Sequence, residues 1–294
     1  MYKGGTPMSL EFGKKPYFMP VFFSGEEDHG INDTSLHSPA DINVISLTYE
    51  TDREALESII PDCYELLEPY VNVKFCEFFG CSWMAGKGYT LINVNCPVRF
   101  KGERDEMDGD LILVMFENHA DPIIGGRDSM GYAKYFAEIP LIENLDGKFS
   151  CKASAWGKPF LEMTVDTNIK ASEEDIEEIK RVEGRAKGKF QYKYIPRVRE
   201  KDEPYEANYC TPDCAYPVVL PAFEKPEDYP YELGASESEW GMGDIKLTAT
   251  TWEDWPHGWR IGAGLAKLQP KRIIATRHFT YKDPGVYYTC YRLR

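Results

Sequence analysis

The sequence predicts an α+β fold, in which a large, mostly antiparallel and barrel-like β-sheet carries a few short helices. Apolar segments of strand length recur along the 294 residues, whereas helical patterns are few. Strands and helices do not alternate regularly, which argues against a doubly wound parallel sheet. We therefore expect one domain over residues 1–294, with an irregular N-terminal extension (1–40) and a proline-rich excursion at about 196–240.

The first strands are indicated by apolar runs and turns. Val44–Tyr49 is apolar and partly β-branched. Val71–Met84 begins with apolar residues at alternate positions, and Gly80 predicts a bulge within it. A glycine-containing turn then leads into Tyr89–Phe100, so we expect a hairpin. The continuous apolar run Leu111–Glu117 is typical of a buried central strand.

A second hairpin is predicted further along the chain. Phe149–Trp156 and Phe160–Thr167 flank the turn residues Gly157-Lys-Pro159. The remaining strand-like runs are Tyr192–Ile195, Tyr216–Leu220, Ile245–Trp252, Arg272–Tyr281 and Val286–Tyr291.

Three short helical segments are predicted. Thr51 and Glu54 have the spacing of a capping box, in which the two side chains satisfy free amides of the first turn. Ser172–Val182 is acidic at its start, as the helix dipole favours, and Gly184 is the expected stop. Arg127–Glu138 is the third candidate, a short segment closed by Pro140.

Charge and composition exclude several functions. The chain has 34 basic and 48 acidic residues, a net charge of −14, which disfavours binding to nucleic acid or to an anionic membrane. No apolar run approaches the ~18 residues of a membrane span, and the N-terminus lacks the apolar core of a signal peptide. We therefore expect a cytoplasmic protein whose 8 cysteines are reduced thiols.

The segment from Asp121 to Pro140 carries the most informative chemistry. It follows an apolar strand, bends at Gly125-Gly126 and presents Lys134 among aromatic and small residues. A lysine amine must be neutral to attack a carbonyl, and apolar surroundings favour the neutral form. The alternative is that Lys134 lies on a short helix as an ordinary solvated residue.

These motifs resemble those of the acetoacetate decarboxylase superfamily. The matching pieces, in order, are Asp121-Pro122, Gly126-Arg127-Asp128 and Gly131-Tyr132-Ala133-Lys134. Upstream, Tyr49–Asp52 and Pro97–Phe100 agree as well, so the resemblance covers residues 42–165 and, more loosely, 245–292. It implies that Lys134 forms a Schiff base with a small keto acid, with no cofactor and in a homo-oligomer. It further implies a substrate site that includes Arg127, Met130, Tyr132 and Leu91.

The chain also departs from the family pattern. Tyr135 stands where the family has a second lysine, so desolvation has to keep Lys134 neutral. Leu91 and Ile42 fall where acetoacetate decarboxylases have a glutamate and a substrate-binding arginine. Both polar groups are absent, which favours a substrate larger or more apolar than acetoacetate. The leading prediction is therefore a carbon–carbon lyase that decarboxylates such a keto acid.

Other functions stay open. Relatives that condense pyruvate with an aldehyde and dehydrate the product carry a glutamine at the position of Met130 and a catalytic tyrosine, for which Tyr281 is the match. Tyr281 is alternatively a rim aromatic, and Arg127 is either a carboxylate ligand or part of a structural ion pair. A non-catalytic binder of small molecules is the third possibility.

A metal-dependent lyase is a fourth reading of the sequence. Glu117, His119 and Asp121 lie at alternate positions and together offer three ligands. With no second histidine nearby, a hydrogen-bonded network beneath the lysine segment is the favoured interpretation, and no metal is predicted.

Overall fold

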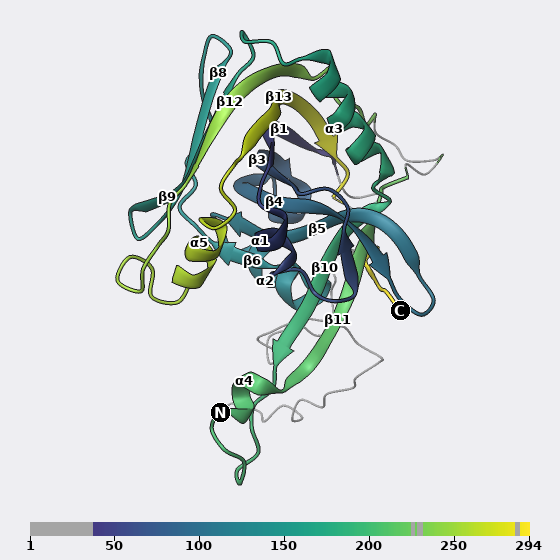
Figure 1. Ribbon diagram of the computed structural model, residues 1–294, viewed down its shortest axis with the longest axis vertical. Helices are drawn as coiled ribbons and strands as arrows, with labels where there is room; N and C mark the ends of the chain where they lie inside the picture. Colours follow the sequence, from purple (N-terminus) through teal and green to yellow (C-terminus); the bar gives the residue numbers. More distant parts are fainter. Residues whose placement is uncertain (1–37, 225–226, 228–231, 286–288) are drawn as a thin grey trace, which may run out of the picture.

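The computed structural model describes residues 38–294, except 225–226, 228–231 and 286–288 (Figure 1). Its strands form one 14-stranded sheet in the order β14-β11-β10-β5-β4-β3-β1-β13-β12-β9-β8-β7, with β2 beside β4 and β6 beside β5. Strand pairs are antiparallel except where β5 meets β10 and β6. The predicted α+β class with a mainly antiparallel sheet is confirmed.

The strands are β1 (Ala40–Glu50), β2 (Tyr64–Leu66), β3 (Tyr70–Cys81), β4 (Lys87–Lys101), β5 (Glu106–Glu117), β6 (Lys134–Phe136), β7 (Glu143–Leu145), β8 (Lys148–Ala155), β9 (Lys158–Asp166), β10 (Gly188–Pro196), β11 (Pro212–Pro221), β12 (Glu239–Leu247), β13 (Arg272–Asp283) and β14 (Tyr291–Arg292). The α-helices are α1 (Arg53–Glu57), α2 (Ala120–Gly125), α3 (Glu173–Arg185), α4 (Ala207–Cys210) and α5 (Trp259–Leu265), beside a 3-10 turn (Ser82–Met84) and a π-helical turn (Gly126–Met130).

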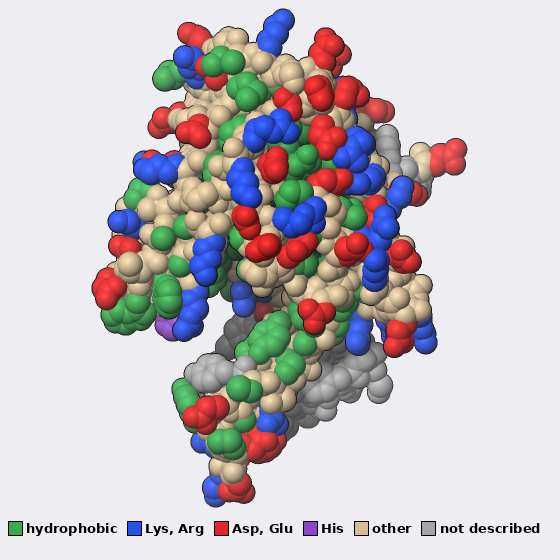
Figure 2. Space-filling view, viewed as in Figure 1, with side chains coloured by type: hydrophobic (Ala, Val, Ile, Leu, Met, Phe, Trp, Pro, Cys, Tyr) green, Lys and Arg blue, Asp and Glu red, His purple; other side chains and the backbone are tan. Residues whose placement is uncertain are grey.

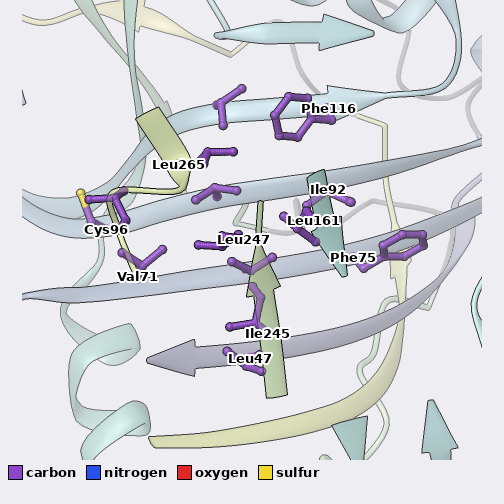
Figure 3. Packing of buried hydrophobic residues seen from close by; sticks show 14 of the residues in the cluster. Leu47, Val71, Phe75, Ile92, Cys96, Phe116, Leu161, Ile245, Leu247 and Leu265 are labelled. Atoms are coloured by element: carbon purple, nitrogen blue, oxygen red, sulfur yellow. The ribbon is translucent and has the colours of Figure 1, made fainter. Parts of the chain in front are cut away.

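The main core lies between two parts of this sheet. One face of β1, β3, β4 and β5 packs against the inner side chains of β8, β9 and β12. Leu47, Phe75 and Ile92 point toward Leu161 and Leu247 from across the core (Figure 3). The opposite face of the same four strands carries a second buried cluster. These strands are therefore buried on both faces, which explains their long apolar runs.

Both predicted hairpins are confirmed. β3 pairs with β4, and the register shifts between Phe78 and Cys81, where Gly80 takes a φ of 73°. A bulge at this glycine was expected, because a positive φ costs glycine little. β8 pairs with β9 around the turn at Gly157. The runs predicted at Tyr192–Ile195 and Tyr216–Leu220 lie in β10 and β11, which pair with each other.

The predicted capping box is wrong by one residue. Asp52 caps α1, because its side chain accepts a hydrogen bond from the Ala55 amide at 3.0 Å. The Thr51 hydroxyl instead donates to the Gln269 carbonyl, which ties the helix start to a distant loop. The helix predicted over Ser172–Val182 is α3. It extends through Gly184 to Arg185, so this glycine does not end the helix.

The expected helix over Arg127–Glu138 is also wrong. Its first residues form the π-helical turn, whereas Lys134 begins strand β6. The edge of β5 offers free backbone groups, and the Met115 amide donates to the Ala133 carbonyl at 3.0 Å. Pairing to this edge outweighs the local helical preference. The strand expected at Ile245–Trp252 ends at Leu247.

Two predicted segments lie partly or wholly outside the described residues. These are most of the N-terminal extension (1–40) and part of Val286–Tyr291, after which β14 begins at Tyr291. The described part of 196–240 contains α4 and β11, which with β10 form an arm that projects from the sheet (Figure 1). Hydrophobic side chains are visible along this arm, which also carries charges at its tip, and charges of both signs are mixed over the upper part of the same view (Figure 2). No helix among the described residues is long and apolar enough to cross a membrane.

Phe160 of β9 packs across the main core against β5, and its loss should destabilise the protein strongly. Its ring is 1% exposed and packs at 4.9 Å from Phe116 and at 5.0 Å from Trp255, measured between ring centroids. We expect Phe160→Ala to lower the free energy of unfolding by about 3–5 kcal/mol, measured by urea titration. Leu145→Ala, at a side chain that is 76% exposed, is the control and should change it by less than about 0.5 kcal/mol.

Candidate active site

A cavity of about 450 Å³ lies on the face of β1, β3, β4, β5 and β13 that is turned away from the main core. Directly paired residues of neighbouring strands point to the same side of a sheet, so the cavity floor consists of transverse rows of side chains. The apolar row is Phe279, Val44, Cys76 and Leu91, and it ends at Glu117.

Two further rows flank the apolar row. The aromatic row is Tyr281, Ile42, Phe78 and Tyr89. The basic row, on the other side, is Arg277, Ser46, Lys74, Asn93 and Met115. The cavity therefore changes from aromatic to basic along the strand direction.

Lys134 supplies an amine at one wall of this cavity. Its side chain starts at β6, which runs parallel to β5 so that Lys134 pairs with Met115. The residue is only 7% exposed. Nζ donates a hydrogen bond to the Pro122 carbonyl at 2.9 Å and lies 2.8 Å from Oε1 of Glu117. The ring centroid of Tyr132 lies 5.3 Å from Nζ, so the amine is held between a carboxylate, a carbonyl and an aromatic face.

Gly126 makes room for this amine. A Cβ atom at Gly126 would lie 2.7 Å from Nζ and 2.5 Å from Cε of Lys134, closer than carbon contacts allow. The π-helical turn that begins at Gly126 ends at Met130 and is followed by Gly131, whose φ of 78° suits glycine. This sequence of α-helix, π-turn and strand returns the chain to β5 with Lys134 facing the cavity.

Glu117 is the partner that the sequence reading did not assign to Lys134. It is the last residue of β5, and none of its surface is exposed. Burial raises the pKa of Glu117 above the usual carboxyl range, although the Lys134 ammonium opposes this shift. Its second oxygen, Oε2, has no hydrogen-bond partner within the described residues. Glu117 is therefore a buried carboxyl placed within proton-transfer distance of the amine, 2.8 Å from Nζ.

Three tyrosines at the aromatic end stay protonated. Burial raises the pKa values of Tyr89, Tyr132 and Tyr281 well above 10, and nearby acidic groups, Asp283 among them, add to the shifts. A neutral phenol donates a hydrogen bond or a proton and does not act as a base near neutral pH. The aromatic end therefore offers donors in apolar surroundings.

The structure brings together most of the residues predicted from the sequence. Leu91, Met130, Tyr132, Lys134 and Tyr281 all line the cavity. Ile42 lies in the aromatic row, although it is not one of the lining residues.

Arg127 is placed differently. It is exposed and does not line the cavity, and its Nη1 donates to the backbone carbonyl of Lys134 at 2.7 Å. In this position Arg127 fixes the backbone of the lysine.

Glu117, His119 and Asp121 do not lie together on one face of a continuous strand. The strand ends at Glu117, and His119 instead caps α2 by accepting a hydrogen bond from the Asp121 amide at 3.4 Å. Within the described residues, no three His, Cys, Asp or Glu side chains come together as a metal site would need.

The polar residues of the basic row were missed by the sequence reading. Lys74 and Asn93 carry no motif, and only the alternation of β3 and β4 could have placed them on the face shared with Leu91. Arg277 and Asp283 reach the cavity from β13, far away in the sequence. Lys189 also lines the cavity from β10.

The fold is that of acetoacetate decarboxylase-like proteins. The crystal structure of acetoacetate decarboxylase from Legionella pneumophila matches with a TM-score of 0.61 at 20% identity, covering 84% of this chain and 82% of that one. The enduracididine biosynthesis enzyme MppR complexed with pyruvate matches with a TM-score of 0.58 at 14% identity, covering 87% and 91%.

The family itself follows from the sequence comparison. The model of the acetoacetate decarboxylase family matches residues 18–283, so the chain belongs to this family. Acetoacetate decarboxylase 1 of Bradyrhizobium diazoefficiens is 30% identical over 133 residues, which is 42% of this chain and 51% of that protein. The chain thus spans about half the length of the curated relatives that it matches.

The buried pair makes a prediction about stability. In Lys134→Ala, Glu117 loses the ion pair and hydrogen bond that lower its pKa, and burial alone then raises the pKa further. A carboxyl whose pKa is higher folded than unfolded destabilises the protein as pH rises. We expect the variant to lose about 3–5 kcal/mol relative to wild type at pH 8 and much less at pH 5, measured by urea unfolding.

The double variant Lys134→Ala, Glu117→Gln is the control for this prediction. It has no carboxylate to titrate at this position, so its free energy of unfolding should fall less between pH 5 and pH 8 than that of the single variant. A pH-independent loss in the single variant would contradict the pairing.

Proposed function

We propose that this protein is a Schiff-base-forming carbon–carbon lyase that decarboxylates a keto acid larger or more apolar than acetoacetate. One observation carries the proposal: the amine of Lys134 is buried at the wall of a largely apolar cavity, 2.8 Å from a buried carboxylate. Membership of the family supports the same chemistry. Leu91 replaces a polar group in the cavity floor, which supports the larger or more apolar substrate.

Glu117 acts as the base that frees the amine. An ammonium has no lone pair, so a proton must leave Nζ before Lys134 can attack a carbonyl. Oε1 of Glu117 lies within hydrogen-bond distance of Nζ, and burial raises the pKa of Glu117, which favours its protonated form. The same proton is then available to the hydroxyl that leaves as water when the imine forms.

The bond changes follow from the imine. The amine adds to the keto carbon, and loss of water gives an iminium ion. The bond between the α-carbon and the carboxylate breaks, its electron pair moves toward the iminium nitrogen, and carbon dioxide leaves. A proton adds to the resulting enamine carbon, and hydrolysis returns the ketone and the free amine. Overall, a keto acid anion and one proton become a ketone and carbon dioxide.

An aldolase-dehydratase is the second candidate, and the position of Tyr281 favours it. This tyrosine lines the same cavity as Lys134 and stays protonated, so it can supply a proton to the oxygen of an aldehyde. The structural neighbour MppR is described in complex with pyruvate. In this reaction the enamine attacks an aldehyde, and no carbon dioxide forms. Release of carbon dioxide therefore separates the two candidates.

Covalent trapping tests the proposal directly. We expect borohydride to fix an adduct on wild type with at least one of a panel of 2- and 3-keto acids, measured by intact mass. Lys134→Ala should give none, because the nucleophile is gone. Lys152→Ala, at an exposed lysine of β8, is the control and should keep the adduct. The adduct mass reports whether a carboxylate was lost.

Three outcomes would count against the proposal. An adduct that survives Lys134→Ala would assign the chemistry to another lysine, which peptide mapping would identify. Absence of any adduct on wild type would instead favour a non-catalytic binding protein. Adducts that always keep the mass of the intact acid, without release of carbon dioxide, would favour the aldolase-dehydratase.

A matched pair of glycine variants tests the geometry around the amine. Gly126→Ala places a methyl group against Nζ, whereas Gly125→Ala meets no atom within 4 Å. Both glycines have right-handed helical backbone angles, so neither change strains the chain. We expect Gly126→Ala to slow adduct formation at least tenfold and Gly125→Ala by less than twofold, measured as the rate of borohydride trapping. Equal rates in the two variants would mean that the amine is not confined as described.

A further inference from the structure

The basic end of the cavity has no role in the chemistry above. Lys74 and Arg277 belong to the basic row, and Lys189 lines the same end from β10. The apolar row separates them from the aromatic end, where Asp283 lies. A cavity with cations at one end and a carboxylate at the other orients an anionic ligand in one direction.

The acids that face these three cations offset only part of their charge. Glu183 of α3 engages Arg277 through both oxygens, at 2.6 and 2.8 Å, and lies 3.5 Å from Nζ of Lys74. One carboxylate is thus shared by two cations. Lys189 forms no ion pair with a described residue, and the acid facing it is Asp110, the residue with which it pairs between β10 and β5. Burial raises the pKa of Asp110, which reduces its ability to offset Lys189.

Asn93 gives independent evidence for a polar ligand group. It is 4% exposed, lines the cavity, and lies in the basic row between Lys74 and Met115. Its Oδ1 atom is buried without a hydrogen-bond partner among the described residues. A buried amide left unpaired costs stability, and either orientation of the amide places an unpaired group beside the cations. A bound carboxylate would satisfy it in the orientation that turns the Nδ2 donor toward the ligand, because an amide oxygen cannot pair with a carboxylate oxygen.

We infer that the substrate is a keto diacid, whose second carboxylate lies at the basic end while its carbonyl meets Lys134. This inference rests on the proposed function for the carbonyl, but the diacid site itself does not require the imine. Lys74 is two strands and one row from Glu117, so their Cα atoms are about 12 Å apart on a sheet of ordinary spacing. The side chains of Lys74 and Lys134 shorten the gap that the substrate spans.

Matched pairs of acids test this assignment. The 3-oxo diacids of six and eight carbons differ from 3-oxohexanoate and 3-oxooctanoate only by a terminal carboxylate in place of a methyl group. We expect borohydride trapping to reach half-saturation at a concentration at least tenfold lower for a diacid than for the monoacid of the same length. Lys74→Gln and Lys189→Gln should each bring that ratio toward one. Lys152→Gln should preserve it.

The two proposals fail in different ways. Adducts that form without preference for the diacids would overturn the inference and leave the lyase proposal intact. Absence of all adducts would overturn the lyase proposal, and calorimetry with octanedioate and octanoate, which cannot form imines, would then decide the inference. Tighter binding of octanedioate that is lost in Lys189→Gln would support the diacid site, and equal binding would overturn it. Because Lys189 is exposed, this variant remains informative if Lys74→Gln does not fold.

Discussion

The contact between Lys134 and Glu117 is the constraint on which the site depends. Both side chains are almost wholly buried, so neither could keep its charge at low cost without the other. The contact exists because β6 adds in parallel to β5, which pairs Lys134 with Met115, two residues before Glu117 at the end of β5. The π-helical turn between the two strands brings Gly126 against the amine, where any side chain would displace it. The backbone of this segment thus positions the amine of Lys134 against the carboxylate of Glu117.

Burial on both faces gives the cavity its rigid floor. The core face of β1, β3, β4 and β5 is fixed by packing against β8, β9 and β12, so the cavity face cannot shift without disturbing that core. The pairing register of the five strands β13, β1, β3, β4 and β5 then determines which side chains lie opposite one another in each row. A site built on strands in this way is held more firmly than one built on loops.

Local signals in the sequence predict part of this arrangement. Alternating apolar residues and glycine turns located both hairpins, and the motif that ends at Lys134 located the amine. The pairing of β6 could not be predicted, because it depends on the free edge of β5 and overrides a local helical pattern. The link between Lys74 and Arg277 was also out of reach, since it requires knowing that β1 lies between β3 and β13. Contacts that depend on the order of strands in the sheet cannot be recognised from patterns within a short stretch of sequence.

The apolar row also bears on specificity. Beside the basic end, the apolar row runs toward the amine through Cys76 and Leu91, of which Leu91 offers no hydrogen bond to a charged group and Cys76 only a weak thiol donor. A carboxylate held over this row would lose its hydration without compensation, which costs several kcal/mol. A ligand with one charge beside Lys134 and a second at Lys74 avoids that cost, whereas one with a charge in between does not. Selection therefore arises as much from what the apolar row rejects as from what the cations attract.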